Sequence, residues 1–399
     1  MARLTYNQIA TILTEAYAQA TGRNPIGNIS WAEMVQCFGT SIPTNTDNLY
    51  GVLEGVLAKT LFAVRPISEP FLGLEMDEQK YGDYIRKLTP ITTEPENNLE
   101  WEIAAEKAKE NPDFSCCSAP VTQDFLAARI SGGNTFARKW TLYRNQINSA
   151  FKDRTGVEDF FSMLATERAN RMKLDRISVK RSLICNAILG AVSYYKGENV
   201  APNLNFKALT AYNTETGLSL TKQDIMQPAN FRPFLIWLKA TVDTLRKMMA
   251  DVSTIYHYNI PGKVVDRHTP YGYERLYILT KYATYFRANE SAIYNPDKLP
   301  IIGDYEEVNY WQDINDPETV KGQANILFND GSIVNIGNTT VNNVIALLCD
   351  RDFMGTANID TWTAPEPYNA RFGFQNTWYH NTYRSLLDWT ENIIVITLD

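Results

Sequence analysis

Apolar side chains recur at helical spacing in two stretches of the first 64 residues. Residues 4–20 carry one such stripe and residues 47–64 carry another, while Ser30 and Glu33 form a capping box for a short helix between them. Three amphipathic helices of this length enclose little core by themselves. We therefore expect residues 1–66 to form a helical arm that lies on neighbouring subunits, or else a small helical subdomain.

The longest predicted helix begins at Gly156 and continues to about Tyr195, since neither Pro nor Gly interrupts it before Gly190. A helix of about 40 residues spans about 60 Å, which is too long for one ordinary core. Its middle carries an excess of positive charge, from Arg168, Arg171, Lys173, Arg176, Lys180 and Arg181. These side chains indicate a solvated charged face, ion pairs between subunits, or a face that meets nucleic-acid phosphates.

The second half of the chain mixes helices and strands without a regular alternation. Apolar positions from Phe231 to Met249 follow helical spacing, with Pro233 expected in the first turn. Beyond them the pattern predicts a helix at Tyr282–Ile293 and strands at Arg275–Lys281, Ile301–Ile302 and Ile326–Phe328. Residues 197–228 are polar and rich in turn formers. This order favours an α+β fold over a doubly wound sheet.

Two apolar runs late in the chain predict buried strands. Val344–Cys349 precedes the charged turn Asp350–Asp352, and Ile393–Ile396 follows much later. The aromatic passage from Trp362 to Ser385 is expected to be loop-like. A buried strand this late must dock into a sheet built from earlier sequence, so the chain is not a string of independent modules.

Residues 65–148 have a different character. Six prolines interrupt any long helix, and acidic residues crowd the stretch from Glu94 to Asp113, against only Lys107 and Lys109. About 80 residues without strong periodicity are uncommon inside a compact domain and usually form a functional projection. The alternative is a solvated surface excursion.

Composition and motifs argue against an enzyme. A net charge of −7 excludes a basic nucleic-acid binder as the class of the whole chain, and five cysteines without a CxxC pair indicate no redox or zinc motif. Phosphate-binding, nucleophile-elbow and zinc-protease motifs do not occur. His257, His268 and His380 are too scattered for a metal site, and His257 and His380, each beside tyrosines, are expected to be packed or hydrogen-bonded rings. Without a signal peptide or an apolar run of about 20 residues, we expect a soluble cytoplasmic product with no catalytic residue, cofactor or metal.

The last part of the sequence resembles a known family. Arg351-Asp352, Asn369-Ala370-Arg371, Tyr379-His380 and Glu391-Asn392 occur in the order found near the C-terminus of major capsid proteins of tailed bacteriophages, in the small-podovirus group. The segment Tyr81 to Leu88 is similar to the start of the long extension loop of these proteins.

The resemblance implies the Hong Kong 97-type capsid fold, an α+β fold with five parts. These are an N-terminal helical arm (1–66), an extended loop or E-loop (67–148), a peripheral domain with a long spine helix (149–227), an axial domain (228–341), and C-terminal strands that complete both domains (342–399). The six basic residues of the long helix would face packaged DNA, and Tyr81, Tyr84, Arg86 and Lys87 would contact the next subunit through the E-loop.

The function implied is that of a head protein that self-assembles into hexamers and pentamers of an icosahedral shell around double-stranded DNA. Its partners would be itself, portal and scaffolding proteins, decoration proteins and non-specifically contacted DNA, with no membrane; it would be assembled in the bacterial host cytoplasm and reside in the virion. Some members of this fold crosslink a lysine to an asparagine, but that set of residues has no match here. The rival readings are an encapsulin-like nanocompartment shell, another virion component of the tail or adaptor, and an enzyme with a cryptic acid–base site.

Overall fold

The computed structural model describes residues 69–76, 84–90, 125–131, 134–144, 154–193, 204–258, 265–291, 305–327 and 333–399. The chain divides into two compact units. The first comprises Met1–Gly82, Gly132–Arg181 and Thr356–Ser385; the second comprises Asp83–Ser131, Ser182–Gly355 and Leu386–Asp399. The predicted N-terminal helices, the acidic run, Tyr81, Ile301–Ile302 and Phe328 lie outside the described residues.

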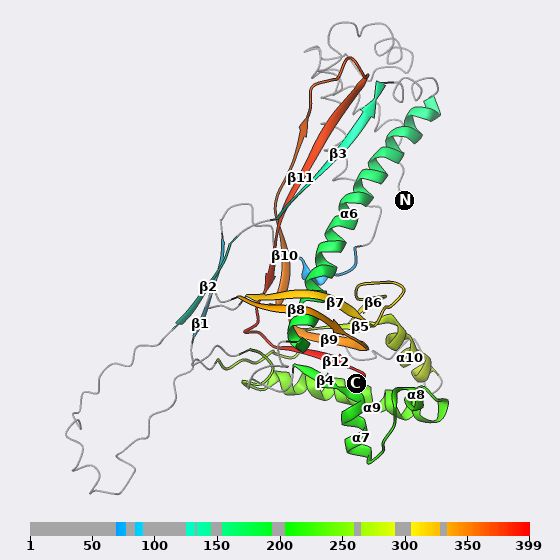
Figure 1. Ribbon diagram of the computed structural model, residues 1–399, viewed down its shortest axis with the longest axis vertical. Coiled ribbons are helices and arrows are strands. Elements are labelled where there is room, and N and C mark those ends of the chain that lie inside the picture. The colour runs from blue at the N-terminus through cyan, green and yellow to red at the C-terminus, as the bar shows by residue number, and fades with distance from the viewer. Residues whose placement is uncertain are drawn as a thin grey trace, which may run out of the picture. The chain divides into compact units, whose positions relative to one another are not determined.

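The first unit contains a three-stranded sheet with the order β10-β11-β3 (Figure 1). Its strands are β3 (Asn134–Tyr143), β10 (Met354–Pro365) and β11 (Phe374–Leu387), and β3 pairs antiparallel with β11. The short helix η1 (Leu72–Leu74) precedes a parallel bridge from Glu75 to Thr356 of β10. The first described residues of the predicted E-loop range are thereby held beside this edge strand.

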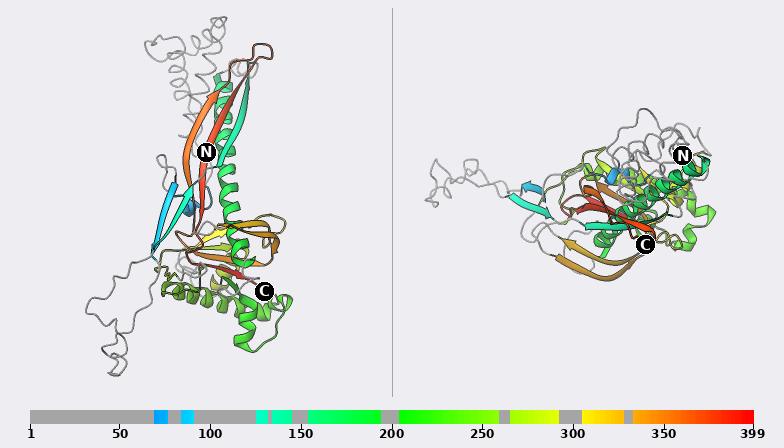
Figure 2. Two further views of the ribbon diagram at one scale, coloured as in Figure 1. Left: turned by 60° about the vertical axis from the view of Figure 1, so that its left-hand side comes forward. Right: turned by 90° about the horizontal axis from the view of Figure 1, so that it is seen from above.

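Helix α6 (Arg154–Ser193) is 40 residues long, so the prediction of one helix from Gly156 to about Tyr195 is confirmed. Its residues up to Arg181 belong to the first unit and those from Ser182 onward to the second. In the first unit, Ala169 and Met172 of α6 form a buried cluster with Tyr379 of β11, and Trp140 of β3 packs against it. Figures 1 and 2 both show α6 along this sheet. One face of the sheet is therefore covered by the helix.

The second unit is built around a mixed five-stranded sheet with the order β4-β12-β9-β5-β6. These strands are β4 (Asn205–Lys207), β5 (Glu274–Leu279), β6 (Glu306–Val308), β9 (Val344–Asp350) and β12 (Ile393–Thr397). Strand β12 lies between β4, to which it is parallel, and β9, to which it is antiparallel. Every residue of β9 and β12 is buried, which confirms the two predicted core strands.

Four helices and two hairpins complete the described part of this unit. The helices are α7 (Ala208–Thr216), α8 (Lys222–Ile225), α9 (Pro228–Ala250) and α10 (Thr280–Ser291). The hairpins are β1 (Tyr84–Pro90) with β2 (Phe125–Ser131), and β7 (Val320–Leu327) with β8 (Ile333–Val341). The N-cap residue of α7, Lys207, has no side-chain cap. In the first turn of this helix, Thr210 donates to the backbone oxygen of Asp399 from its amide (3.2 Å) and its hydroxyl (3.0 Å).

Several predicted elements were wrong. The aromatic passage expected to be loop-like forms the end of β10 and most of β11, and the supposedly aperiodic stretch before residue 148 contains β1, β2 and β3. Aromatic residues occupy both faces of β11, so the usual alternation of apolar and polar side chains is hidden. Helix α9 begins at Pro228, which places Pro233 inside the helix rather than in its first turn. Residues 197–228, expected to be turns, contain β4, α7 and α8.

Candidate functional site

The six basic residues of α6 divide into buried and accessible groups. Arg168 is 3% exposed, and its guanidinium lies 5.5 Å from the centre of the Trp140 ring. Lys180 is 2% exposed; its ammonium lies 2.7 Å from Glu75 and 3.6 Å from Glu69. A buried cation is stable only with such partners. Both side chains are engaged within the first unit, so their burial does not favour contact with DNA, which stays a prediction for them.

The other four basic residues remain at least partly accessible. Arg171 is exposed, whereas Lys173, Arg176 and Arg181 are half-buried. One guanidinium nitrogen of Arg176 lies 3.8 Å from Glu69, the carboxylate that also serves Lys180. The accessible positive charge of this helix is therefore smaller than the sequence indicates, and Arg171 is its most open member.

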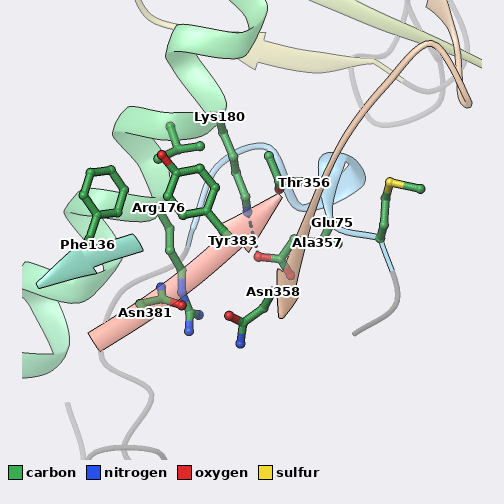
Figure 3. A pocket seen from close by; sticks show the side chains of 11 residues that line it. Glu75, Phe136, Arg176, Lys180, Thr356, Ala357, Asn358, Asn381 and Tyr383 are labelled. Atoms are coloured by element: carbon green, nitrogen blue, oxygen red, sulfur yellow. Dashed lines mark hydrogen bonds and ion pairs between the residues drawn. The ribbon is translucent and has the colours of Figure 1, made fainter. Parts of the chain in front are cut away.

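A cavity of about 140 Å³ lies between α6 and the sheet of the first unit (Figure 3). Its lining includes Phe136 and Tyr383, whose rings stack with centroids 5.0 Å apart, and the side chains of Arg176 and Lys180. Asn358 and Asn381 add amide groups. Because Lys180 is paired with Glu75 at the same cavity, the charges there largely neutralise each other, which is typical of a structural ion-pair cluster.

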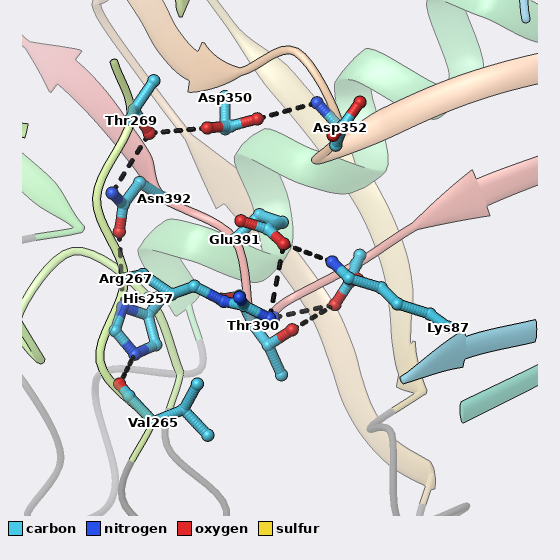
Figure 4. A network of polar contacts seen from close by, with 11 residues as sticks. Lys87, His257, Val265, Arg267, Thr269, Asp350, Asp352, Thr390, Glu391 and Asn392 are labelled. Atoms are coloured by element: carbon cyan, nitrogen blue, oxygen red, sulfur yellow. Dashed lines mark hydrogen bonds and ion pairs between the residues drawn. The ribbon is translucent and has the colours of Figure 1, made fainter. Parts of the chain in front are cut away.

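A second polar network surrounds Lys87 of β1 in the second unit (Figure 4). The Lys87 ammonium donates to the carboxylates of Asp388 and Glu391. Arg267 approaches Glu391 at 3.5 Å and donates to the backbone oxygen of Thr390 at 3.1 Å. The network joins the β1–β2 hairpin to the segment that precedes the last strand.

The two carboxylates of this network respond differently to their surroundings. Burial raises the pKa of Asp388, but the charge of Lys87 and hydrogen bonds from Lys87 and Thr390 outweigh burial, so its pKa lies below the ordinary value. For Glu391 burial dominates, and the opposing charges of Lys87 and Arg267 do not compensate, so its pKa is raised. Asp388, with a side chain 1% exposed, is the stably ionised anchor of Lys87.

A chain of hydrogen bonds continues from this segment into the core. Asn392 donates to Thr269 at 3.1 Å, and Thr269 donates to Asp350 at 2.6 Å. His257 is fully buried, with one ring nitrogen 2.6 Å from the carbonyl of Val265 and the other 3.3 Å from Asn392. This confirms His257 as a packed, hydrogen-bonded ring. His380 stacks on Trp362 at 3.9 Å and 11°, so it too is a packed ring.

Three of the four residues predicted to contact the next subunit through the E-loop lie in the described part of the chain. Tyr84, Arg86 and Lys87 lie on β1, opposite Ser131, Arg129 and Ala128 of β2. The Lys87 ammonium is already engaged by two carboxylates of its own chain, and no sequence pattern indicated this contact. Its assignment to a contact with the next subunit is therefore not supported by its geometry, and contacts through Tyr84 and Arg86 stay predictions.

Among the described residues no group of three or more His, Cys, Asp or Glu side chains could hold a metal ion. In the same part of the chain, no helix is long and apolar enough to cross a membrane. Cys185 and Cys349 are buried, and burial raises the pKa of the Cys349 thiol to about 12, so this thiol stays protonated and unreactive.

Comparison with known proteins decides the family. Residues 8–397 match the family model described as Phi29-like phage major capsid protein. The chain belongs to this family. It is a phage major capsid protein, a class whose copies form the icosahedral shell, and it is a component of the virion. The match also decides against the encapsulin-like and the tail or adaptor hypotheses, and it indicates a structural role.

Solved structures of phage particles contain chains that are similar in fold. A chain from the structure of the head fiber and inner core protein gp22 of native bacteriophage P68 is similar with a TM-score of 0.51 and 12% identity, over 84% of this chain and 89% of that one. The capsids of Staphylococcus phage Andhra (TM-score 0.44, 11% identity, 84% and 88% covered) and Cyanophage P-SCSP1u (0.42, 11%, 84% and 90%) are further neighbours. A search of curated protein sequences finds no match. The fold is the Hong Kong 97-type fold of tailed-phage capsid proteins, as the C-terminal resemblance implied.

Proposed function

We propose that this capsid protein assembles into hexamers and pentamers around double-stranded DNA, in the cytoplasm of a bacterial host, and that it catalyses no reaction. The family match carries this proposal. It is supported by the chemistry of the described carboxylates: Asp388 and Glu391 are held by Lys87 and Arg267, and Glu69 and Glu75 by Lys180. Portal and scaffolding proteins are the expected partners, with decoration proteins as a further class.

The parts of the chain are proposed to have separate assembly roles. Residues 1–66 would be the arm, 67–148 the E-loop, 149–227 the peripheral domain, 228–341 the axial domain and 342–399 the completing strands. The β1–β2 hairpin supports the second assignment, because it brackets the acidic run between Glu94 and Asp113. Such an acidic run would meet a basic surface of the next subunit. Tyr84 and Arg86 would lie at the base of the projection that carries the run.

Contact with the genome is proposed for the accessible cations of α6, with Arg171 as the principal one and Lys173, Arg176 and Arg181 as supporting charges. These side chains would attract phosphates without reading sequence. Arg168 and Lys180 are left out because both are buried.

Charge reversal at Arg171 tests this proposal. Arg232 of α9 is also exposed and serves as the matched control, since it lies on another helix of the second unit. We expect Arg171→Glu to form shells as wild type does but to hold less DNA per particle, with the difference from wild type shrinking at higher salt because salt screens the contact in both proteins, while Arg232→Glu retains the wild-type content. Equal DNA content in both variants, or failure of Arg171→Glu to form shells, would show that Arg171 serves subunit contacts instead.

A further inference from the structure

The sheet of the first unit has one covered face and one open face. Phe136, Arg138 and Trp140 of β3 point toward α6, where Arg138 pairs with Asp175 and Trp140 meets Arg168. In a strand, the residues between them point the other way. Within the described part of this unit α6 is the one α-helix, so no helix described by the structure lies over the opposite face.

The open face carries an aromatic stack. Trp362 of β10 lies on His380 of β11 at 3.9 Å, and the Trp378 ring follows at 6.5 Å from His380. Lys139 of β3 lies 5.8 Å from the centre of the Trp378 ring. Trp362 is 47% exposed. We call these four residues, Lys139, Trp362, Trp378 and His380, the aromatic face.

An uncovered sheet face is ordinarily polar. Two tryptophans and a histidine in a continuous stack are instead the composition of a surface that buries aromatic area against a partner. Trp378 is fixed in its position by Glu366, which accepts its indole proton and also accepts from Asn376 at 2.7 Å. The ring stack is therefore preorganised in the subunit, which lowers the entropic cost of docking.

The chain itself offers an occupant. Residues 47–64 form a predicted helix with an all-aliphatic stripe, made by Leu49, Val52, Leu53, Val56, Leu57 and Leu61, that needs a surface to cover it. Five residues after Val64, Glu69 is fixed in the first unit by Lys180. Five residues reach at most about 18 Å. The chain then runs beside β10, where the amide of Met76 donates to Thr356 at 2.9 Å.

We propose that the aromatic face is the docking surface for the amphipathic helix at residues 47–64. The apolar stripe covers Trp362, His380 and Trp378, and the short tether to Glu69 raises the local concentration of the helix at this surface. Edge strand β10, beside which the tether arrives, also carries the most exposed ring of the stack. The first unit thereby becomes a sheet with a helix on each face, which is a stable layer arrangement.

Site-specific photocrosslinking tests the docking. The full chain is prepared with p-benzoyl-phenylalanine in place of Trp362 and, as a control, in place of Phe372, which is 63% exposed and outside the aromatic face. After irradiation, peptides are mapped by mass spectrometry. We expect crosslinks from position 362 to residues 47–64 and none to them from position 372. Mixing isotopically labelled and unlabelled chains reports which copy supplies the helix. Crosslinks from position 362 to any other segment, to a co-purified protein or to DNA, or no crosslink at all, would overturn the proposal.

A second experiment keeps the aromatic face native. Leu53→Asp with Leu57→Asp places two charges in the apolar stripe, whereas Ala58→Asp places one charge on the opposite side of the predicted helix. Because the two charges prevent burial of the apolar stripe, the double variant should raise hydrogen exchange across β10 and β11 at least about tenfold. Ala58→Asp should leave it unchanged. Unchanged exchange in the double variant, or an equal rise in both, contradicts the docking.

Discussion

The indole ring of Trp389 lies directly against Gly190 of α6, so that a Cβ at position 190 would come closer than 3.0 Å to the ring. Trp389 is 2% exposed and also contacts the rings of Tyr258 and Phe353. The Tyr258 hydroxyl donates to the backbone oxygen of Gly190 at 3.0 Å. This contact explains why the long helix contains a glycine where helix propensity favours alanine.

Gly190→Ala is therefore expected to destabilise the subunit, because the added methyl group must displace a buried ring. Overpacking of this kind costs about 1–3 kcal/mol in the free energy of unfolding. Denaturant unfolding of the unassembled protein measures it. Gly337→Ala in β8, where nothing lies within 4 Å of the added atom, is the control and should lie near wild type. A neutral Gly190→Ala would show that Trp389 moves freely.

Lys87→Met should destabilise the second unit by leaving the carboxylates of Asp388 and Glu391 without their shared cation. Loss of one partner of a buried ion pair costs roughly 3–5 kcal/mol, and the partial exposure of Lys87 places the expected loss toward the lower end. The control is Lys321→Met, which removes an exposed pair with Asp316 at 3.7 Å and should change stability by less than about 1 kcal/mol. Similar losses in the two variants would contradict a special role for Lys87.

The Lys87 network also predicts opposite pH effects for its two acids. Because the folded-state pKa of Asp388 is depressed below 3.8, its contribution is fully present above that pH and is lost as the pH falls through the folded-state value. Because the pKa of Glu391 is raised above 4.5, its ionisation opposes folding at neutral pH, and that opposition disappears as the pH falls toward 4.5.

Unfolding free energies from pH 7 to 3 check both signs. Relative to wild type, Glu391→Gln should be most favourable at neutral pH and lose that advantage toward pH 4.5. Asp388→Asn should be most unfavourable above pH 3.8 and approach wild type below it. Parallel pH profiles of all three proteins would refute the opposite pKa shifts assigned to Asp388 and Glu391.

Substitutions at Lys180 and Arg171 should affect the melting temperature differently, although both residues are cations of α6. Lys180→Met leaves Glu75 and Glu69 without their buried partner and should lower the melting temperature of the subunit by several degrees. Arg171→Met removes an exposed charge and should leave the melting temperature nearly unchanged. The reverse order of effects would mean that Arg171 carries structural contacts.

The sequence was informative where the pattern was local. The boundaries of α6 were predicted within two residues because no breaker interrupts its interior, and β9 and β12 were predicted because fully buried strands are continuous apolar runs. Strands β10 and β11 were missed because both of their faces carry aromatic or polar side chains. Their faces are set by α6 and by the aromatic stack, neither of which is visible as a period in the sequence.

The candidate site depended on distant partners and was therefore less predictable. The burial of Lys180 follows from Glu75, which is 105 positions away, and that of Arg168 from Trp140. Lys87 finds its anchor 301 positions later, at Asp388. A run of basic residues predicts a charged helix, but which of the charges stay accessible is decided by contacts that composition and spacing do not encode.

The position of β12 between β4 and β9 has a consequence for how the protein is made. Val395 of β12 pairs with Asn205 of β4, so about 190 further residues are synthesised after β4 before its partner strand β12 exists. At 5–20 residues per second this is roughly 10–40 s of translation. Throughout that interval β4 lacks a partner on the edge that β12 will occupy, and β9 lacks one on its β12 edge once Asp350 has been synthesised. A nascent subunit therefore completes its central sheet late, and chains that stop short of β12 are expected to be recognised by chaperones and proteases before they can join a shell.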